Sequence, residues 1–301
     1  MSPRSERAAR PLTARALRAR PLPRPDEGGD KEDRGRTLVV GGAPTLPGAL
    51  VLAGTAVLRA GAGKLQLATC RSVALHVGTA VPEALVVHLP ESRGGGISAG
   101  AAGAIAERAE QADALLLGPG MVDERAIAAL LGRLLPRVAK PVVVLDAGAL
   151  APLAHSPELL RDLGGRAVLT PHAGEMASLL GVDKADVERD PAAAARRAAA
   201  ELGAVVALKG AATLVADPDG ALLRYEGGRV GLATSGSGDT LAGIVAGLVA
   251  RGASPLDGAA WGVFLHGEAG NALARRVGPI GYLARELLDE VPPLMARLAK
   301  R

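Results

Sequence analysis

Residues 231–252 read GLATSGSGDTLAGIVAGLVARG, a short glycine-rich turn followed by a long apolar run. The run predicts a helix over about residues 239–251. A helix that begins at such a turn presents unpaired backbone N–H groups at the positive end of its dipole, which suits a phosphate or an oxyanion. We therefore expect an anion hole formed by Gly236, Ser237 and Gly238.

Asp239 lies in the first turn of this expected helix. The helix dipole and nearby donors favour its ionised form, and beside a transferring phosphoryl group it could accept the proton of an attacking hydroxyl. The alternative interpretation is a simple helix cap after a flexible turn. The element by itself predicts only phosphoryl transfer to some hydroxyl group.

Upstream of this segment, short apolar runs alternate with Ala- and Leu-rich helical stretches. Runs of about four to six apolar residues are typical of strands buried on both faces of a parallel sheet. Two further runs between residues 205 and 226 flank a turn at 217–220, which predicts an antiparallel pair. We expect an α/β fold in three layers, with helices covering a mostly parallel central sheet. The runs are TLVVG (37–41), KLQLAT (64–69), ALVVHL (84–89), ALLLG (114–118), VVVLDA (142–147), AVLT (167–170) and VVALKG (205–210).

Composition and charge limit the classes of function. The net charge of +4 comes from residues 1–36, which hold 10 basic and 6 acidic residues, and the rest of the chain is neutral. A neutral body argues against a nucleic-acid partner. Cys70 is the only cysteine, so neither an intramolecular disulfide nor a thiolate metal cluster is expected.

The chain is expected to divide into an Arg- and Pro-rich flexible arm over residues 1–30 and one catalytic domain over residues 31–301. It contains no secretory apolar segment and no stretch near the roughly 20 apolar residues that span a bilayer. We therefore expect a cytoplasmic protein with no membrane partner.

Several loops directly after the apolar runs carry polar or glycine residues, and ligands of open α/β sheets bind at the carboxyl ends of strands. His172 and Glu175 follow one run, although Glu175 could equally cap a helix. Gly120 and Asp146 follow two others, and neither a GxGxxG nor a GxxxxGK[ST] motif is present. One loop could contact nucleotide phosphates or ribose: Lys209, Gly210, Ala211, Ala212 and Thr213.

Taken in order, these segments resemble the dehydratase family of NAD(P)H-hydrate repair, which has a ribokinase-like fold. The resemblance covers residues 30 to 292. Its motifs are GGAPTLPGALVLAGTAVLRAGAGKLQLAT, LLLGPGM, VVVLDAGAL, LTPHAGEMASLLG, ALKGAATLV, GLATSGSGDTLAGIVAGLVARG and GVFLHGEAG. Gly-x-Gly-Asp alone would indicate only the ribokinase-like superfamily, whereas TPHAGE with KGAAT and GLATSGSGD narrows the resemblance to the dehydratases.

The resemblance implies a reaction and a set of site residues. ADP would phosphorylate the hydroxyl of (S)-NADHX or (S)-NADPHX, and loss of phosphate would give NAD(P)H, with AMP as the second product. Asp239 would be the catalytic base. By family position, Ala49, Gly120, His172 and Asp239 would contact the hydrate, while Gly238 and residues 209–213 would contact the nucleotide.

The same resemblance implies Mg²⁺ as a cofactor, a homo-oligomer such as a tetramer, and a functional partnership with a separate NAD(P)HX epimerase. No protein site for the metal is readable in the sequence. The chain departs from the family pattern at Ala43, Leu46, Gly148, Ala173 and Asn271. Gly148 stands where a second acidic residue is common, so no catalytic role is assigned to that loop.

Two other functions share some of these features. A ribokinase-like kinase for a hydroxyalkyl heterocycle of vitamin synthesis would share Gly238 and Asp239. A catalytically silent nucleotide-binding protein would account for the departures from the family pattern. His266, near Trp261 and Phe264 in a helix with apolar spacing, is expected to be structural.

Overall fold

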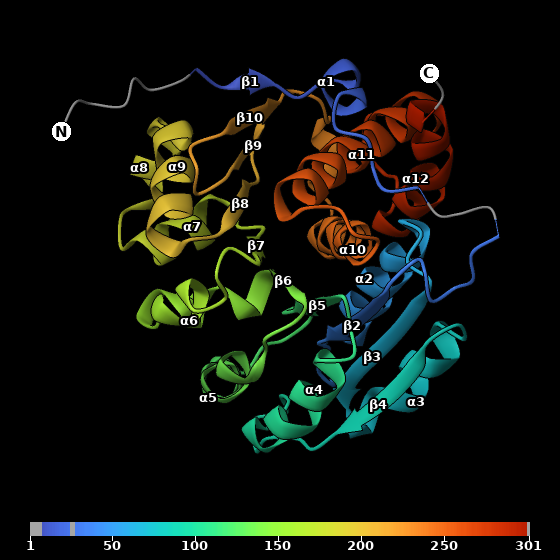
Figure 1. Ribbon diagram of the computed structural model, residues 1–301, viewed down its shortest axis with the longest axis vertical. Helices are drawn as coiled ribbons and strands as arrows, with labels where there is room; N and C mark the ends of the chain where they lie inside the picture. Colours follow the sequence, from blue (N-terminus) through green and yellow to red (C-terminus); the bar gives the residue numbers. More distant parts are fainter. Residues whose placement is uncertain (1–7, 25–27, 300–301) are drawn as a thin grey trace.

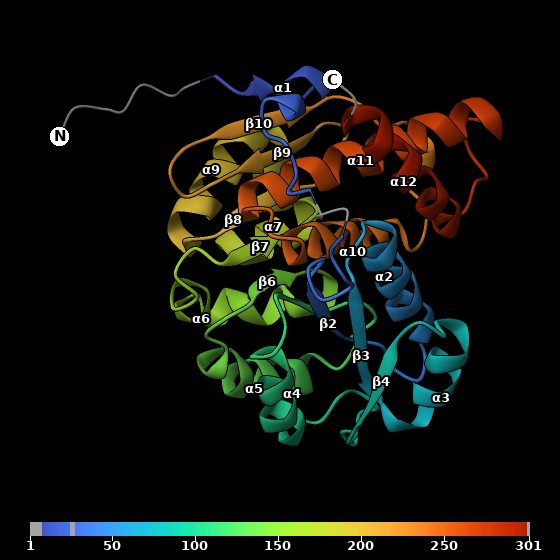
Figure 2. The same ribbon diagram turned by 45° about the vertical axis from the view of Figure 1, so that its right-hand side comes forward.

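The computed structural model describes residues 8–24 and 28–299, which form a ten-stranded sheet between two layers of helices (Figures 1 and 2). The strand order is β1-β10-β9-β8-β7-β6-β5-β2-β3-β4. Separate clusters of buried apolar side chains pack on the two faces of the sheet. The predicted α/β fold with a mostly parallel sheet is confirmed.

The strands coincide with the apolar runs of the sequence. Every residue of β5 and β8 is buried, as expected for strands covered on both faces. The parallel part of the sheet consists of β2 (Arg36–Val40), β3 (Lys64–Cys70), β4 (Leu85–Leu89), β5 (Ala114–Leu117), β6 (Val142–Leu145), β7 (Ala167–Leu169) and β8 (Val205–Leu208). The predicted hairpin is formed by β9 (Thr213–Ala216) and β10 (Leu222–Tyr225), and β9 also pairs antiparallel with β8.

The helices divide between the two faces (Figure 1). One face packs against α2 (Pro47–Arg59), α10 (Ser237–Ala250), α11 (Pro255–Arg276) and α12 (Ala284–Ala299). The other packs against α4 (Ala102–Ala109), α5 (Glu124–Leu134), α6 (Glu158–Arg161), α7 (Ala173–Leu180), α8 (Lys184–Arg189) and α9 (Pro191–Leu202). Near the sheet edge, α3 (Arg71–Ala80) contacts β4.

Glycines let α10 approach α2 closely. A methyl group on Gly243 would lie 2.2 Å from the Ala53 carbonyl oxygen, and one on Gly247 would lie 2.6 Å from the Val57 carbonyl oxygen. The backbones of the two helices therefore touch where side chains would normally separate them. This contact fixes the helix that carries the Gly-x-Gly-Asp segment against the core.

Residues 8–24 are packed on the domain, which differs from the expectation of a flexible arm over residues 1–30. The short strand β1 (Arg10–Pro11) pairs with β10, and α1 (Ala14–Arg18) follows it. Leu12 and Leu17 are buried, and the Trp261 indole N–H donates to the Arg20 carbonyl at 2.7 Å. Two leucines and one backbone carbonyl therefore hold a segment whose charge suggested mobility. Residues 1–7 and 25–27 of the expected arm lie outside the described residues, and residues 28–30 are exposed.

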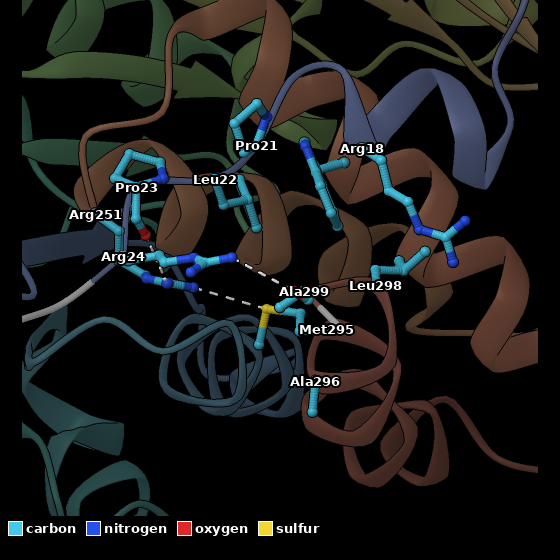
Figure 3. Close-up of a pocket in the computed structure, with 11 residues that line it drawn as sticks. Arg18, Pro21, Leu22, Pro23, Arg24, Arg251, Met295, Ala296, Leu298 and Ala299 are labelled. Carbon is cyan, nitrogen blue, oxygen red and sulfur yellow. Dashed lines mark hydrogen bonds between the residues drawn. The ribbon is translucent and has the colours of Figure 1, made fainter. Parts of the chain in front are cut away.

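A cavity of about 480 Å³ lies between this segment and the carboxyl-terminal helix (Figure 3). Its lining includes Arg24, Arg251 and Met295, and none of the predicted site residues contributes to it. The Arg251 guanidinium donates to the carbonyl oxygens of Ala60 and Pro23, so it links α10 to the amino-terminal segment. Within the described part of the chain, no helix is long and apolar enough to cross a membrane.

Replacement of Gly243 by Ala tests the contact between α10 and α2. We expect a loss of about 1–3 kcal/mol in the free energy of unfolding, because the new methyl group meets backbone. Gly132 is the matched control, since it lies exposed within α5 and a methyl group there would meet nothing within 4 Å. Gly132→Ala is expected to stabilise by up to about 1 kcal/mol through helix propensity. Urea unfolding measures both, and equal effects would contradict the close-packing argument.

Candidate active site

Three neighbouring strands and one helix bring the predicted site residues together. Asp146 follows β6, Thr170 follows β7 and Lys209 follows β8, so all three lie at the carboxyl edge of the sheet. The Lys209 amide donates to the Pro171 carbonyl at 2.8 Å, which extends the pairing of β7 and β8 into these loops. The amino terminus of α10 meets them there, because a methyl group on Gly238 would lie 3.5 Å from Lys209 Nζ.

An ion pair joins the loops after β6 and β8. Lys209 Nζ lies 3.0 Å from Asp146 Oδ1 and 3.9 Å from Glu175 Oε2. The Thr170 hydroxyl donates to the same Asp146 oxygen at 2.7 Å. Burial alone would lower the pKa of Lys209, but Asp146, Glu175 and Asp239 together raise it above its ordinary value. The site therefore holds a fixed ammonium ion beside Gly238.

Asp239 is a carboxylate with an altered proton affinity. Burial, and then the negative charge of Asp146, raise its pKa to about 6, although Lys209 and the residue's own backbone amide act in the opposite direction. A carboxylate whose pKa lies near the working pH can take up a proton in one step and release it in the next. This raised pKa contrasts with the expectation that the helix dipole and nearby donors would favour the ionised form. It suits a general base, and that role of Asp239 stays a prediction.

The anion hole differs in detail from the prediction. Gly236 begins the turn with φ of 85°, and the Ser237 amide donates to the Thr234 carbonyl at 3.2 Å, so it serves the turn. Within residues 8–24 and 28–299, the Gly238 amide has no backbone carbonyl partner. Gly238 also faces Lys209. An anion bound here would meet the Gly238 amide and the Lys209 ammonium together.

The predicted hydrate-binding residues Ala49 and Gly120 lie side by side. A methyl group on Gly120, where φ is 70°, would lie 3.1 Å from Ala49 Cβ and 2.5 Å from the Leu46 carbonyl oxygen. The same loop reaches the charged cluster through Gly118, whose own methyl position would lie 1.8 Å from the Asp146 carbonyl oxygen. A side chain is excluded at both Gly118 and Gly120 because other backbone lies too close.

His172 caps a helix as well as standing near the site. Its Nδ1 accepts from the amides of Gly174 and Glu175 at 3.0 and 3.2 Å, while Glu175 Oε2 accepts from the His172 amide at 2.7 Å. This capping box begins α7, so the alternative interpretation of Glu175 is confirmed. Because Nδ1 is an acceptor in this geometry, a neutral His172 carries its proton on the exposed Nε2.

The predicted nucleotide loop borders a cavity of about 550 Å³ between β8, β9 and helices α8 and α9. Lys209, Gly210, Ala211 and Ala212 form one wall. Thr213 begins β9 opposite Tyr225. The loop is thus open on one side to a space large enough for part of a small molecule. The lining also includes Val187, Asp190, Pro191 and Arg224.

The sequence analysis missed the part played by Asp146. It assigned no role to this loop because Gly148 stands where a second acidic residue is common in the family. The carboxylate is 1% exposed and binds both Lys209 and Thr170. Gly148 has a separate explanation, since a methyl group there would lie 2.3 Å from the Met121 carbonyl oxygen. The sequence signal that could have identified Asp146 is its position directly after the apolar run VVVL, at the carboxyl end of an expected strand.

Two other residues make contacts that the sequence did not predict. His266 lies on α11 as expected, but its Nε2 is 2.9 Å from the Ser237 hydroxyl in the Gly-x-Gly-Asp turn. Asn271 donates from its amide to Glu268 Oε1 at 3.0 Å, and the Tyr225 hydroxyl donates to the same oxygen at 2.9 Å. An aspartate at position 271, common in the family pattern, would repel Glu268 in this arrangement.

Known proteins resemble this chain over nearly its whole length. The family model for NAD(P)H-hydrate dehydratase matches residues 37–293. An ADP-dependent (S)-NAD(P)H-hydrate dehydratase of Xanthomonas campestris is 53% identical over 97% of this chain and 98% of its own. A bifunctional NAD(P)H-hydrate repair enzyme of Moorella thermoacetica is 43% identical over 95% of this chain, which corresponds to 54% of that protein.

A solved structure gives the same result. The ADP/ATP-dependent NAD(P)H-hydrate dehydratase of Bacillus subtilis, co-crystallised with ATP and Mg²⁺, superposes with a TM-score of 0.80 at 28% identity. The superposition covers 97% of this chain and 99% of that one. Together with the matched family model, these likenesses show that the chain belongs to the NAD(P)H-hydrate dehydratase family.

Proposed function

We propose that this protein dehydrates (S)-NAD(P)H-hydrate to NAD(P)H at the expense of ADP, with AMP and phosphate as the other products. The observation that carries the proposal is the convergence of the Gly238 amide, the Lys209 ammonium and the Asp239 carboxylate at the amino terminus of α10. These groups suit a phosphoryl acceptor that must lose a proton while phosphate charge is stabilised. The family relationship supports the hydrate as the acceptor.

Each group has a defined part in the proposed reaction. Asp239 removes the proton of the ring hydroxyl, whose oxygen attacks the terminal phosphorus of ADP while the bond to the AMP oxygen breaks. Lys209 and the Gly238 amide stabilise the negative charge on the transferring phosphoryl oxygens. Phosphate then leaves with the electrons of the carbon–oxygen bond, and loss of a ring proton restores the double bond.

The two halves of the site are proposed to separate the two substrates. Ala49, Gly120, His172 and Asp239 are proposed to contact the hydrate, a role supported by their positions in the family pattern. The loop from Lys209 to Thr213, with Gly238, binds the nucleotide, which the cavity beside that loop supports.

Mg²⁺ is proposed to enter with the nucleotide. Among the described residues, no group of three or more His, Cys, Asp or Glu side chains is placed to hold a metal ion. Asp146 is engaged by Lys209 and Thr170, so the chain offers few free carboxylate ligands. Mg²⁺ keeps several waters and binds substrate phosphates, so the phosphates of ADP would supply its main ligands at this site. The ion supplies charge neutralisation on the phosphates when bound.

Further features stay predictions. We propose a homo-oligomer such as a tetramer, a cytoplasmic location and cooperation with a separate NAD(P)HX epimerase. The last is supported by the bifunctional repair enzymes, since this chain corresponds to about half of the Moorella thermoacetica protein. Light scattering tests the assembly.

A turnover assay separates the proposed function from its alternatives. Incubation with hydrated NADH and ADP should restore the absorbance of the reduced nicotinamide ring and release AMP and phosphate in equal amounts. A kinase for a hydroxyalkyl heterocycle would instead accumulate a stable phosphate ester of its own substrate. No recovery with either ADP or ATP would refute the dehydratase proposal.

Replacement of Asp239 by Asn tests the general base. We expect turnover to fall by about 10²–10⁴-fold, because the amide cannot accept the hydroxyl proton. The affinity for ADP, measured by calorimetry, should stay nearly unchanged. Turnover close to that of the wild type would mean that another group removes the proton.

The rate should depend on the protonation of Asp239. Because its pKa is about 6, the ionised fraction and hence kcat/KM should rise as pH increases through about 6 and then level off. An ordinary aspartate would give a midpoint near its usual value of 3.8. A pH–rate profile that is flat between pH 5 and 7 would contradict the raised pKa.

Asp146→Asn should move that midpoint to lower pH. Removal of the Asp146 charge withdraws one cause of the raised Asp239 pKa, and it also frees Lys209 to pair with Asp239. Both changes favour the ionised carboxylate. Asp219→Asn removes a negative charge from the exposed β9–β10 turn and is expected to leave the profile unchanged. A shift toward higher pH in the Asp146 variant would rule out this electrostatic coupling.

A further inference from the structure

The residues Gly236, Ser237 and Gly238 begin α10, and only Ser237 has a side chain that can connect this turn to the rest of the protein. Gly236 needs positive φ, and a methyl group there would lie 2.4 Å from Leu52 Cδ1. Gly238 faces Lys209, since a methyl group there would lie 3.5 Å from Lys209 Nζ and 3.8 Å from Asp146 Oδ2. Ser237, between them, is 6% exposed and is the only residue of the three with a side chain.

That side chain is bound to a histidine on the next helix. The Ser237 hydroxyl oxygen lies 2.9 Å from His266 Nε2. The other hydrogen bonds of the turn are local, since the Ser237 amide donates to the Thr234 carbonyl and the Thr240 hydroxyl donates to the Gly236 carbonyl at 3.0 Å. The contact with His266 therefore ties the turn to a separate element.

The helix that carries His266, α11, is closely packed against α10 and against the core. It packs on α10 at two glycines, because methyl groups on Gly258 and Gly262 would lie 2.4 and 2.5 Å from the side chains of Val249 and Val245. Trp261 and Phe264 on the same helix are buried. A hydrogen bond from this helix can thus fix the first turn of α10 with little freedom.

The imidazole is held in its neutral form. Burial lowers the pKa of His266 to about 4, and the nearby Lys209 charge acts in the same direction, against the Ser237 backbone carbonyl. Neutral imidazole has one donor and one acceptor nitrogen, so in either tautomer a single proton lies between Nε2 and the Ser237 oxygen. The contact therefore adds no positive charge next to Lys209 and Asp239.

We propose that His266 is a positioning residue, which holds Ser237 and thereby aims the Gly238 amide at the transferring phosphoryl group. The inference rests on the proposed function. If His266 served only to pack α11 in the core, an apolar side chain could replace it. The proposal gives the imidazole a part in the reaction. Without this hydrogen bond the Gly238 amide would be misaligned. The transition state, in which charge develops on the phosphoryl oxygens, would then be less stabilised and kcat would fall.

Four variants test the proposal: His266→Leu, Ser237→Ala, their combination, and His266→Gln. Leu and Ala each remove the hydrogen bond, and we expect kcat to fall by about 10-fold or more while the Kd for ADP changes by less than about threefold. The combined variant should be no worse than either single one, because both remove the same contact. Gln can place an amide near the position of Nε2 and should recover most of kcat.

The controls separate positioning from folding and from the identity of the reaction. His76→Leu makes the same chemical change on the exposed face of α3 and should leave kcat unchanged. Melting temperatures report folding, and Ser237→Ala tests the same bond if His266→Leu is unstable. An active wild type with kcat preserved in His266→Leu, or with losses that multiply in the combined variant, would refute the inference alone. A wild type that fails to dehydrate the hydrate would refute the function and the inference with it.

Discussion

The ion pair between Lys209 and Asp146 is the interaction on which the site depends. It joins loops that follow two different strands, and Thr170, which follows the strand between them, donates to the same carboxylate. A partly buried ammonium would lose its charge without carboxylates around it, but Asp146, Glu175 and Asp239 raise the pKa of Lys209. Lys209 therefore stays charged at the carboxyl edge of the sheet, where α10 begins.

Asp239 lies in the same electrostatic environment as Lys209, but there the raised pKa favours the neutral form. Lys209 favours its ionised form, whereas burial and the Asp146 charge oppose it, and the balance leaves its pKa at about 6. One pair of charges thus produces a cation that stays charged and a carboxylate that can exchange a proton. The close packing of α10 on α2 makes this possible, because it holds Asp239 at a fixed distance from both charges.

The fold class could be predicted from the sequence, and so could several of the residues that the structure brings together at the candidate site. Buried runs such as ALLL and VVVL are strands because their apolar side chains need covering on both faces. The glycine-rich turn and Asp239 were also evident, since a helix start is a local feature. Asp146 with Lys209, and Ser237 with His266, were not evident, because such contacts join segments far apart in the chain. The packing of residues 8–24 escaped prediction for the same reason, since Leu17 and the Arg20 carbonyl find their partners on distant helices.

Departures from the family pattern are offset locally in this chain. Asn271 avoids the repulsion that an aspartate would have from Glu268, and it adds a hydrogen bond that fixes the carboxylate bound by Tyr225. Ala173 occupies the first position of α7, where a proline would restrict the backbone. The capping box of His172 and Glu175 fixes the same turn by two side chains. The turn at Ala173 is therefore held by side-chain hydrogen bonds, and the groups proposed to carry out phosphoryl transfer lie at other positions.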